Sequence, residues 1–332
     1  MPTYTPEQDF TGYSNVVVND PVSISYTPPG APIGYIREVP IVVTAPDIPP
    51  PPGPLPVVIW SHGGADGAKA GVYKKNDWRI AFAKAGYVTI NLTHKSVGTV
   101  GRNAIEAYLN DGVTTGTFKA QNYLRLFDIQ EVINRLPDID AALSSTLSYG
   151  LHTSKICLGG HSAGSGAVIT HAGATRAFST NPAALGYDYT FLPSRLAQCH
   201  ICCSIQGIDP LDHLAVGSWT SVRDNAQVLM LTGVGDTPGM PPYSADRSYP
   251  YTEMPGTANS KYLYYLTVAR PNHGFYNLAG NFTLSLDLGD WMVSAAWAFL
   301  DANLKSSARG RDWIDRSPHP WDSDGRIDWR RK

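Results

Sequence analysis

The sequence predicts an α/β protein built on a doubly wound, mostly parallel sheet. Short apolar runs alternate with segments of helical periodicity from Leu55 to about Leu304, a pattern typical of a parallel sheet with helices on both faces. One run, Pro56–Trp60, is apolar throughout, as expected of a central strand buried on both faces. Because ligands of such sheets bind beyond the carboxyl ends of the strands, we expect the functional site in the loops that follow these runs.

The length and composition favour one large domain. A chain of 332 residues that is 43% hydrophobic and 16% charged can bury a sizeable core. We divide it into a β-rich N-terminal segment with a proline-rich loop (1–54), an α/β core (55–304) and a C-terminal tail (305–332). The tail carries three tryptophans among mixed charges, and it could either pack as a surface arm or dock on a partner.

The individual elements follow from periodicity and from the positions of glycine and proline. Strands are predicted at 22–26, 35–44, 56–60, 87–92, 156–158, 200–206, 227–232 and 261–268. Helices are predicted at 77–85, 121–136 and 286–304, with a shorter one near 104–109. A further helix is predicted after the turn at residues 160–164 and runs to about residue 175. Pro137 is expected to end the helix that begins at Gln121, because proline lacks the amide hydrogen that a helix interior needs.

The stretch Gly160-His-Ser-Ala-Gly164 places a serine between two glycines at a predicted strand-to-helix turn. Such a turn strains the backbone of Ser162 and leaves little room for side chains two positions before and after it. The helix amides that follow favour a developing negative charge. The pattern therefore predicts a nucleophilic serine, although in a chain with 31 glycines a Gly-x-Ser-x-Gly stretch can also be an ordinary turn.

A serine hydroxyl is a weak nucleophile at neutral pH and needs an adjacent base. His273 follows the last predicted strand in a Pro-Asn-His-Gly-Phe loop and is the predicted base, with His213 as the alternative. His161, Gly63 and Tyr73 are predicted to line the substrate site. Other histidines are predicted to be structural or surface residues: His94, His152, His171, His200 and His319.

The acid of a catalytic triad orients the histidine and stabilises its cation. Asp236 follows a predicted strand 37 residues before His273, and we favour it because a turn there would direct its carboxylate inward. Asp209 follows the preceding predicted strand and is the alternative acid, with Asp212 third. Each carboxylate could instead belong to a turn or cap a helix.

Two backbone amides are needed to stabilise the oxyanion of a tetrahedral intermediate. The predicted donors are the amide of Ala163, directly after the serine, and the amide of Gly64 in the loop after Trp60. Glycine at 64 would leave room for an acyl group. The alternative for residues 61–67 is an ordinary glycine turn, and a phosphate loop is disfavoured because no Gly-Lys-Ser/Thr follows.

Charge, hydropathy and cysteine spacing disfavour several other classes of protein. A net charge of −2 gives no general attraction for nucleic acid, and no apolar run reaches the roughly 18 residues that span a bilayer. The N-terminus lacks the features of a signal peptide, so we expect a cytoplasmic protein, or a secreted one whose signal peptide has been replaced by a methionine. Cys199 and Cys202 have the spacing of half a zinc site without a second pair, so buried thiols are expected instead.

Four segments together resemble the α/β-hydrolase superfamily: Val-Ile-Trp-Ser-His-Gly-Gly, Gly-His-Ser-Ala-Gly, Leu-Thr-Gly-Val-Gly-Asp and Asn-His-Gly-Phe. Within it they are similar to the dienelactone hydrolase, platelet-activating-factor acetylhydrolase and chlorophyllase-like branch, with cutinase-like polyester hydrolases as neighbours. The resemblance extends from about Leu55 to Leu304. It implies the α/β-hydrolase fold, with eight to nine strands, and a serine carboxylesterase that uses no metal or cofactor.

The chain departs from these families at two points. Dienelactone hydrolases use a cysteine nucleophile where this chain has Ser162. The segment Gly207-Ile-Asp-Pro210 resembles chlorophyllase-type sequences, in which the acid follows the earlier strand, so the choice between Asp236 and Asp209 stays open.

The sequence thus predicts a serine hydrolase of small-molecule or polymeric esters. The candidate pocket segments are aromatic and weakly charged (96–119, 176–198 and 239–260), which favours uncharged apolar or aromatic esters, with polyesters as an extension. An acyltransferase or peptidase with the same triad, and an inactive binding module of the same fold, are the alternatives. The sequence makes no prediction of oligomeric state.

Overall fold

The computed structural model describes the greater part of the chain. The described residues are 3–7, 9, 15–18, 23–47, 53–64, 77–95, 98–109, 117–176, 178, 197–205, 207, 214–236, 247–257, 259–268, 273–278 and 286–332. Four residues named from the sequence lie outside them: Tyr73, Asp209, Asp212 and His213.

Strands and helices alternate through the core of the chain. The strands are β1 Asn15–Val18, β2 Ser23–Tyr26, β3 Arg37–Pro46, β4 Leu55–Ser61, β5 Val88–Leu92, β6 Leu151–His161, β7 Ala197–Cys203, β8 Gln227–Gly233, β9 Lys261–Leu266 and β10 Ile327–Arg331. The helices are α1 Asp77–Lys84, α2 Gly98–Leu109, α3 Thr117–Asn134, α4 Leu136–Leu143, α5 Ala163–His171, α6 Tyr249–Glu253, the 3₁₀ turn η3 Phe275–Asn277, α7 Leu286–Leu304 and α8 Ala308–Ile314.

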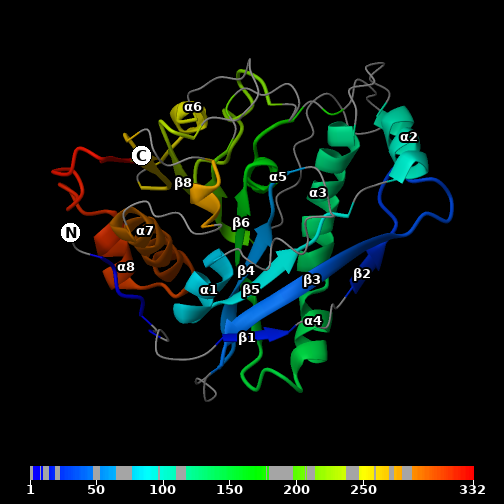
Figure 1. The fold of residues 1–332 in the computed structure, drawn as a ribbon, viewed down its shortest axis with the longest axis horizontal. Coiled ribbons are helices and arrows are strands. Elements are labelled where there is room, and N and C mark those ends of the chain that lie inside the picture. Colours follow the sequence, from blue (N-terminus) through cyan, green and yellow to red (C-terminus); the bar gives the residue numbers. More distant parts are fainter. Residues whose placement is uncertain are drawn as a thin grey trace.

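A mostly parallel sheet forms the centre of the molecule (Figure 1). Its strand order is β1-β3-β5-β4-β6-β7-β8-β9-β10, with β2 paired to β3 beside this path. All pairings from β5 through β9 are parallel, and the pairings of β1, β2 and β5 with β3 and of β10 with β9 are antiparallel. The predicted α/β class with a mostly parallel sheet is therefore confirmed.

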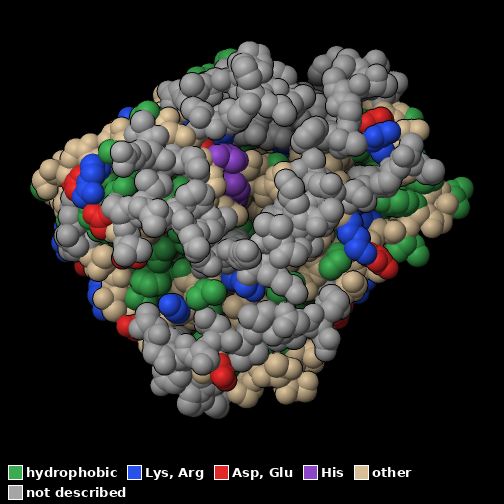
Figure 2. Space-filling view, in the orientation of Figure 1, with side chains coloured by type: hydrophobic (Ala, Val, Ile, Leu, Met, Phe, Trp, Pro, Cys, Tyr) green, Lys and Arg blue, Asp and Glu red, His purple; other side chains and the backbone are tan. Residues whose placement is uncertain are grey.

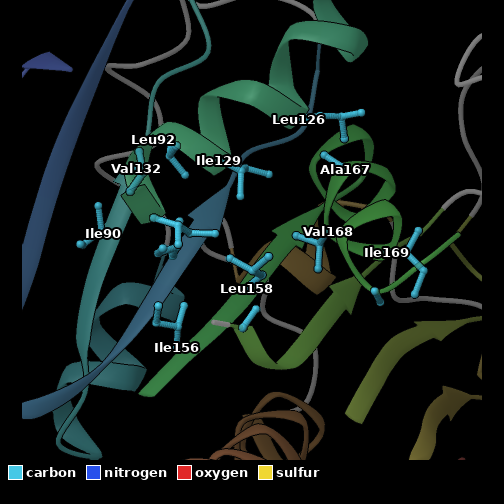
Figure 3. Close-up of a cluster of buried hydrophobic side chains, with 14 of the residues drawn as sticks. Ile90, Leu92, Leu126, Ile129, Val132, Ile156, Leu158, Ala167, Val168 and Ile169 are labelled. Atoms are coloured by element: carbon cyan, nitrogen blue, oxygen red, sulfur yellow. The ribbon is translucent and has the colours of Figure 1, made fainter. Parts of the chain in front are cut away.

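The two faces of the sheet are buried under different helices. On β4, Val57 and Ile59 join one core cluster, whereas Val58 and Trp60 join the other, because successive side chains of a strand point to opposite faces. Helices α3 and α5 cover the first face (Figure 3), where side chains from helices and strands pack together, among them Ile90, Leu92, Leu126, Ile129, Val132, Ile156, Leu158, Ala167, Val168 and Ile169. Helices α1, α7 and α8 cover the second, where Trp78 stacks on both Trp60 and Phe82, and Phe82 packs at a tilt against Trp60.

Helix boundaries depart from the sequence prediction at proline and glycine. Helix α3 ends at Asn134, and α4 begins at Leu136 with Pro137 in its first turn, since proline is tolerated there without an amide hydrogen. The predicted end of one helix is thus the start of another. Helix α5 stops at His171 rather than near residue 175, and Gly173 follows with φ of +120°, outside the helical range.

The C-terminal tail packs against the body of the protein. Its strand β10 pairs antiparallel with β9, joining Ile327 to Leu266, and its helix α8 packs on α7. Trp313, Trp321 and Trp329 surround His319, with ring centroids 4.7 to 5.2 Å from that of the imidazole. Neither this helix nor this strand was predicted from the sequence.

The cysteines lie buried in the core on both faces of the sheet. Cys199 and Cys202 belong to the core clusters on opposite faces of the sheet, and all four cysteines are buried free thiols. Among the described residues, no three or more histidine, cysteine, aspartate or glutamate side chains gather as metal ligands would. In the same part of the chain, no helix combines the length and hydrophobicity needed to cross a membrane.

Candidate active site

Ser162 occupies a strained turn between β6 and α5. Its backbone angles are φ 56° and ψ −123°, a combination that residues other than glycine rarely adopt. A Cβ on Gly160 would lie 2.6 Å from the carbonyl carbon of Gly164, and one on Gly164 would lie 2.1 Å from the carbonyl oxygen of Ser61. Both glycines are therefore required, because backbone fills the space where a side chain would begin.

Hydrogen bonds fix this turn to the neighbouring strand β7. The Ser162 amide donates to the carbonyl of Cys203 at 3.0 Å. The Ser165 hydroxyl lies 2.6 Å from the carbonyl oxygen of Gly160 and 2.7 Å from that of Cys203. Among the described residues, no backbone acceptor is found for the amide of Ala163, which is expected of the first residue of a helix. That amide is available to an anion beside Ser162.

His273 and Asp236 form a hydrogen-bonded pair beyond the ends of β8 and β9. His273 Nδ1 lies 2.9 Å from Asp236 Oδ1, and the side chains are 30% and 0% exposed respectively. Since the carboxylate accepts, Nδ1 carries the proton and Nε2 is left as a proton acceptor. Figure 2 shows histidine side chains that reach the surface in a hollow on one face of the molecule.

Besides His273, three other side chains of the described residues contact the Asp236 carboxylate. The hydroxyls of Ser204 and Thr232 donate to its Oδ2 at 2.7 and 2.8 Å, and Arg247 Nε lies 3.3 Å from its Oδ1. Burial tends to raise the pKa of this carboxyl, but the hydrogen bond from His273 and the charge of Arg247 outweigh burial and lower the pKa below its usual value. The group is therefore a carboxylate at neutral pH.

His161 connects the serine turn to the His273 loop. Its Nε2 donates to the backbone carbonyl of His273 at 2.8 Å, and the two ring centroids are 4.6 Å apart. Burial, together with the positive charge that His273 can carry, lowers the pKa of His161 to about 3, so the ring is neutral. His161 is 7% exposed and its ring contacts His273; that it lines the substrate site stays a prediction.

The loop after β4 lies directly against Ser162. A Cβ on Gly63 would be 2.9 Å from Cβ of Ser162 and 3.0 Å from Nδ1 of His161. Gly64 has φ of +75°, which favours glycine. A Cβ built on it would have no atom within 4 Å, so the space beside it is open. No acceptor is found for the Gly64 amide among the described residues. The structure thus brings the predicted oxyanion loop to the serine.

Three groups around Asp236 were missed from the sequence: Ser204, Thr232 and Arg247. Ser204 directly follows β7 and Thr232 lies near the end of β8, so their positions at strand ends could have indicated them. Arg247 comes from the segment treated only as a pocket wall, and no local pattern distinguishes it. Predicted residues whose relation to the site is not described are Tyr73, Asp209, Asp212 and His213.

Comparison of the chain with protein-family models gave no match, and comparison with curated proteins gave none either. Functional interpretation therefore depends on the geometry of these residues.

Proposed function

We propose that the protein is a serine carboxylic ester hydrolase of the α/β-hydrolase type. The observation that carries the proposal is the strained backbone of Ser162 directly after His161, whose ring contacts His273 of the His273–Asp236 pair at 2.9 Å. The three residues follow β6, β8 and β9, whose carboxyl ends meet at one edge of the sheet. Their order along the chain is that of α/β-hydrolases.

In the first half of the reaction, Ser162 Oγ attacks the ester carbonyl carbon and its proton passes to His273 Nε2. The carbonyl oxygen becomes an oxyanion, which the amides of Gly64 and Ala163 stabilise. Collapse of this intermediate breaks the carbon–oxygen bond of the ester. The leaving alcohol takes the proton from His273, and the acyl group remains on Ser162.

In the second half, water attacks the acyl-enzyme and gives a proton to His273. A second oxyanion forms in the same position, and its collapse breaks the bond to Ser162 Oγ. Ser162 recovers its proton from His273, and the carboxylic acid leaves. Asp236 stays ionised throughout and stabilises the imidazolium while it exists.

The proposed substrates are uncharged apolar or aromatic esters, with polyesters as an extension. The support is compositional, because the segments predicted to wall the pocket (96–119, 176–198 and 239–260) are aromatic and carry few charges. The triad accepts many leaving groups, so these walls would set the selectivity.

The direct test is Ser162→Ala, which removes the nucleophile. We expect kcat on p-nitrophenyl butyrate to fall by about 10⁴-fold or more, and labelling by a fluorophosphonate probe to disappear. Ser154→Ala is the matched control, because Ser154 is exposed on the same strand. Retention of ordinary turnover by Ser162→Ala would refute the proposal. A series of esters with different acyl chains, ending with a polyester film, would define the substrate class.

A further inference from the structure

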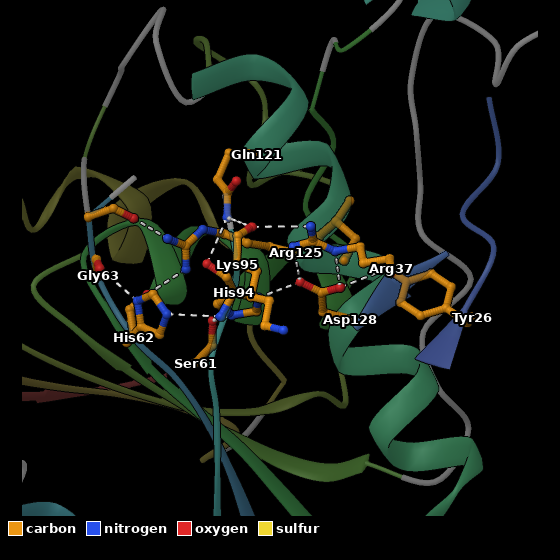
Figure 4. A network of polar contacts seen from close by, with 12 residues as sticks. Tyr26, Arg37, Ser61, His62, Gly63, His94, Lys95, Gln121, Arg125 and Asp128 are labelled. Carbon is orange, nitrogen blue, oxygen red and sulfur yellow. Dashed lines mark hydrogen bonds and ion pairs between the residues drawn. The ribbon is translucent and has the colours of Figure 1, made fainter. Parts of the chain in front are cut away.

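Arg125 of α3 binds two carbonyl groups of the loop after β4 (Figure 4). Its Nη1 donates to the carbonyl oxygen of His62 at 2.6 Å, and its Nη2 donates to that of Gly64. Arg125 is fully buried, and its planar guanidinium presents these two donors in a fixed geometry. One side chain thus fixes two of three consecutive residues in the loop.

The carbonyl between them is held by the ring of His62. His62 Nδ1 donates to the oxygen of Gly63 at 2.8 Å, while Nε2 accepts the amide hydrogen of His94 at 3.1 Å. The ring must be neutral to do both. Burial and the neighbouring charge of Arg125 lower its pKa well below the usual value, so it is neutral at any pH where the protein would work.

Fixing these carbonyls also fixes the amides on the opposite side of each peptide. In a trans peptide the C=O and N–H bonds point in opposite directions. The contact between Arg125 and the His62 carbonyl therefore sets the direction of the Gly63 amide, and the contact between the His62 ring and the Gly63 carbonyl sets that of the Gly64 amide. A Cβ on Gly63 would lie 2.9 Å from Cβ of Ser162, so this loop packs against the serine, and the Gly64 amide that the His62 ring orients is the proposed oxyanion donor.

A second, buried hydrogen-bonded chain supports the same loop. The Ser61 hydroxyl lies 2.8 Å from His94 Nε2, and His94 Nδ1 lies 2.8 Å from Asp128 Oδ2. Arg37 donates to both oxygens of Asp128, at 2.6 and 2.7 Å. The order serine, histidine, aspartate matches a catalytic triad, but the three side chains are at most 1% exposed, so no substrate reaches them and their role is structural.

We propose that Arg125, acting with His62, is the positioning residue that keeps the oxyanion loop 62–64 in its catalytic geometry before substrate binds. This inference rests on the proposed esterase function and deepens it. The oxyanion exists only in the transition state and the tetrahedral intermediates, so a loop that loses its geometry lowers kcat and leaves ground-state binding nearly unchanged.

The test compares Arg125→Met, Arg125→Lys and wild type on p-nitrophenyl butyrate. Loss of one oxyanion donor costs about 100- to 1,000-fold in rate, so we expect kcat of Arg125→Met to fall about 100-fold and KM to stay within about twofold. Arg125→Lys keeps a cation but cannot donate to both carbonyls in one plane, so a loss of about tenfold is expected. Should Arg125→Met fail to fold, Arg125→Lys carries the test.

The affinities of two inhibitors distinguish a positioning role from a purely structural one. A trifluoromethyl ketone forms an oxyanion on Ser162, whereas the matching methyl ketone binds as a ground-state analogue. The affinity of the first should fall in parallel with kcat and that of the second should not change. The inference is overturned if the affinity of both ketones and kcat are retained in the variants.

Lys261→Met is the matched control for stability. Lys261 is another buried cation that donates to backbone carbonyls, those of Arg223, Asp224 and Ala226 at 3.1, 2.9 and 2.7 Å, but it begins β9, at the edge of the sheet opposite the site. We expect this variant to lose stability while its kcat remains. If wild-type protein is not labelled by a fluorophosphonate, the esterase proposal fails and this inference fails with it. Labelling with unaltered Arg125 variants would overturn the inference alone.

Discussion

Asp236 bears a negative charge at a position without solvent exposure, where a carboxyl group would ordinarily be protonated. Two hydroxyl donors, one arginine and one histidine offset the cost of burial. Because Asp236 stays ionised, the proton on His273 remains at Nδ1 and Nε2 faces away from the carboxylate. This tautomer is the one that the proposed role of His273 as a base requires.

Replacement of this carboxylate separates the two candidate acids. Asp236→Asn should lower kcat by up to about 10⁴-fold, because an amide stabilises neither the correct tautomer nor the imidazolium. Asp209→Asn should retain most of the activity. Steady-state kinetics on p-nitrophenyl butyrate give both values, and a larger loss for Asp209→Asn would assign the acid to Asp209.

Chain order predicted Ser162, His273 and Asp236, because each follows a recognisable strand. The Arg247 contact was not predictable in this way. Its side chain donates hydrogen bonds to the backbone oxygens of Asp236 and Ser204. Every residue has a backbone carbonyl, so the residue types at these positions do not indicate the contact. A buried charged residue can therefore be predicted from sequence more readily than the groups that stabilise it.

At the level of elements, the turn between β6 and α5 and the loop after β4 are in direct backbone contact. Gly164 faces the carbonyls of Ser61 and His62, the latter also bound by Arg125. The Ser162 turn and loop 62–64 therefore pack as one unit, and we expect a change in either to displace the other.

Gly164→Ala tests this coupling. The new methyl group would lie 2.1 Å from the Ser61 carbonyl oxygen, and since backbone cannot move as a rotamer does, we expect a stability loss of about 1–3 kcal/mol. Under the esterase proposal, activity should fall further than stability explains, because the displaced loop carries the proposed oxyanion donor Gly64. Urea unfolding and kcat measured below the transition check both.

Gly289→Ala is the control for this substitution. Gly289 lies in α7 with nothing within 4 Å of its would-be Cβ, so alanine should stabilise the helix by about 0.5–1 kcal/mol and leave kcat unchanged. Equal activity in the Gly164 and Gly289 variants would show that the two active-site elements are not coupled.

At the scale of the whole molecule, several neutral histidines are buried in the core. Burial lowers the pKa of His94 to about 4 and of His161, His171 and His200 to about 3, whereas an unfolded histidine titrates near 6.5. The unfolded chain therefore binds more protons than the folded protein between these values. Stability is complete above about pH 6.5 and falls as the pH drops toward 4.

Each such histidine should contribute up to about 1.4 kcal/mol per pH unit to this loss. Urea unfolding between pH 7 and 4.5 measures the slope, in a range where Asp236 and Asp128, with their lowered pKa values, stay ionised. His171→Gln keeps a donor for the Leu126 carbonyl and should reduce the slope by about one proton. An unchanged slope in that variant would contradict the assignment.

Both ends of the chain complete the sheet. Strands β1, β2 and β3 extend one edge, and β10 covers the other by pairing with β9. The strands predicted at 22–26 and 35–44 correspond to β2 and β3, whereas β1 was not predicted. The tail, with its tryptophans and mixed charges, showed no strand period. Its strand forms because β9 offers an unpaired edge, which is a property of the partner and not of the tail.

The sequence by itself determined the α/β class, the parallel central strands and the positions of Ser162, His273, Asp236 and Gly64 at strand ends. Local periodicity and glycine placement suffice for these, because they report burial and turns within a few residues. Only the tertiary structure decided what surrounds them: the Ser61–His94–Asp128 chain and the Arg125 contacts join residues 33 to 63 positions apart. Such contacts depend on how strands and helices pack against each other, and a pattern within a few residues does not predict that packing.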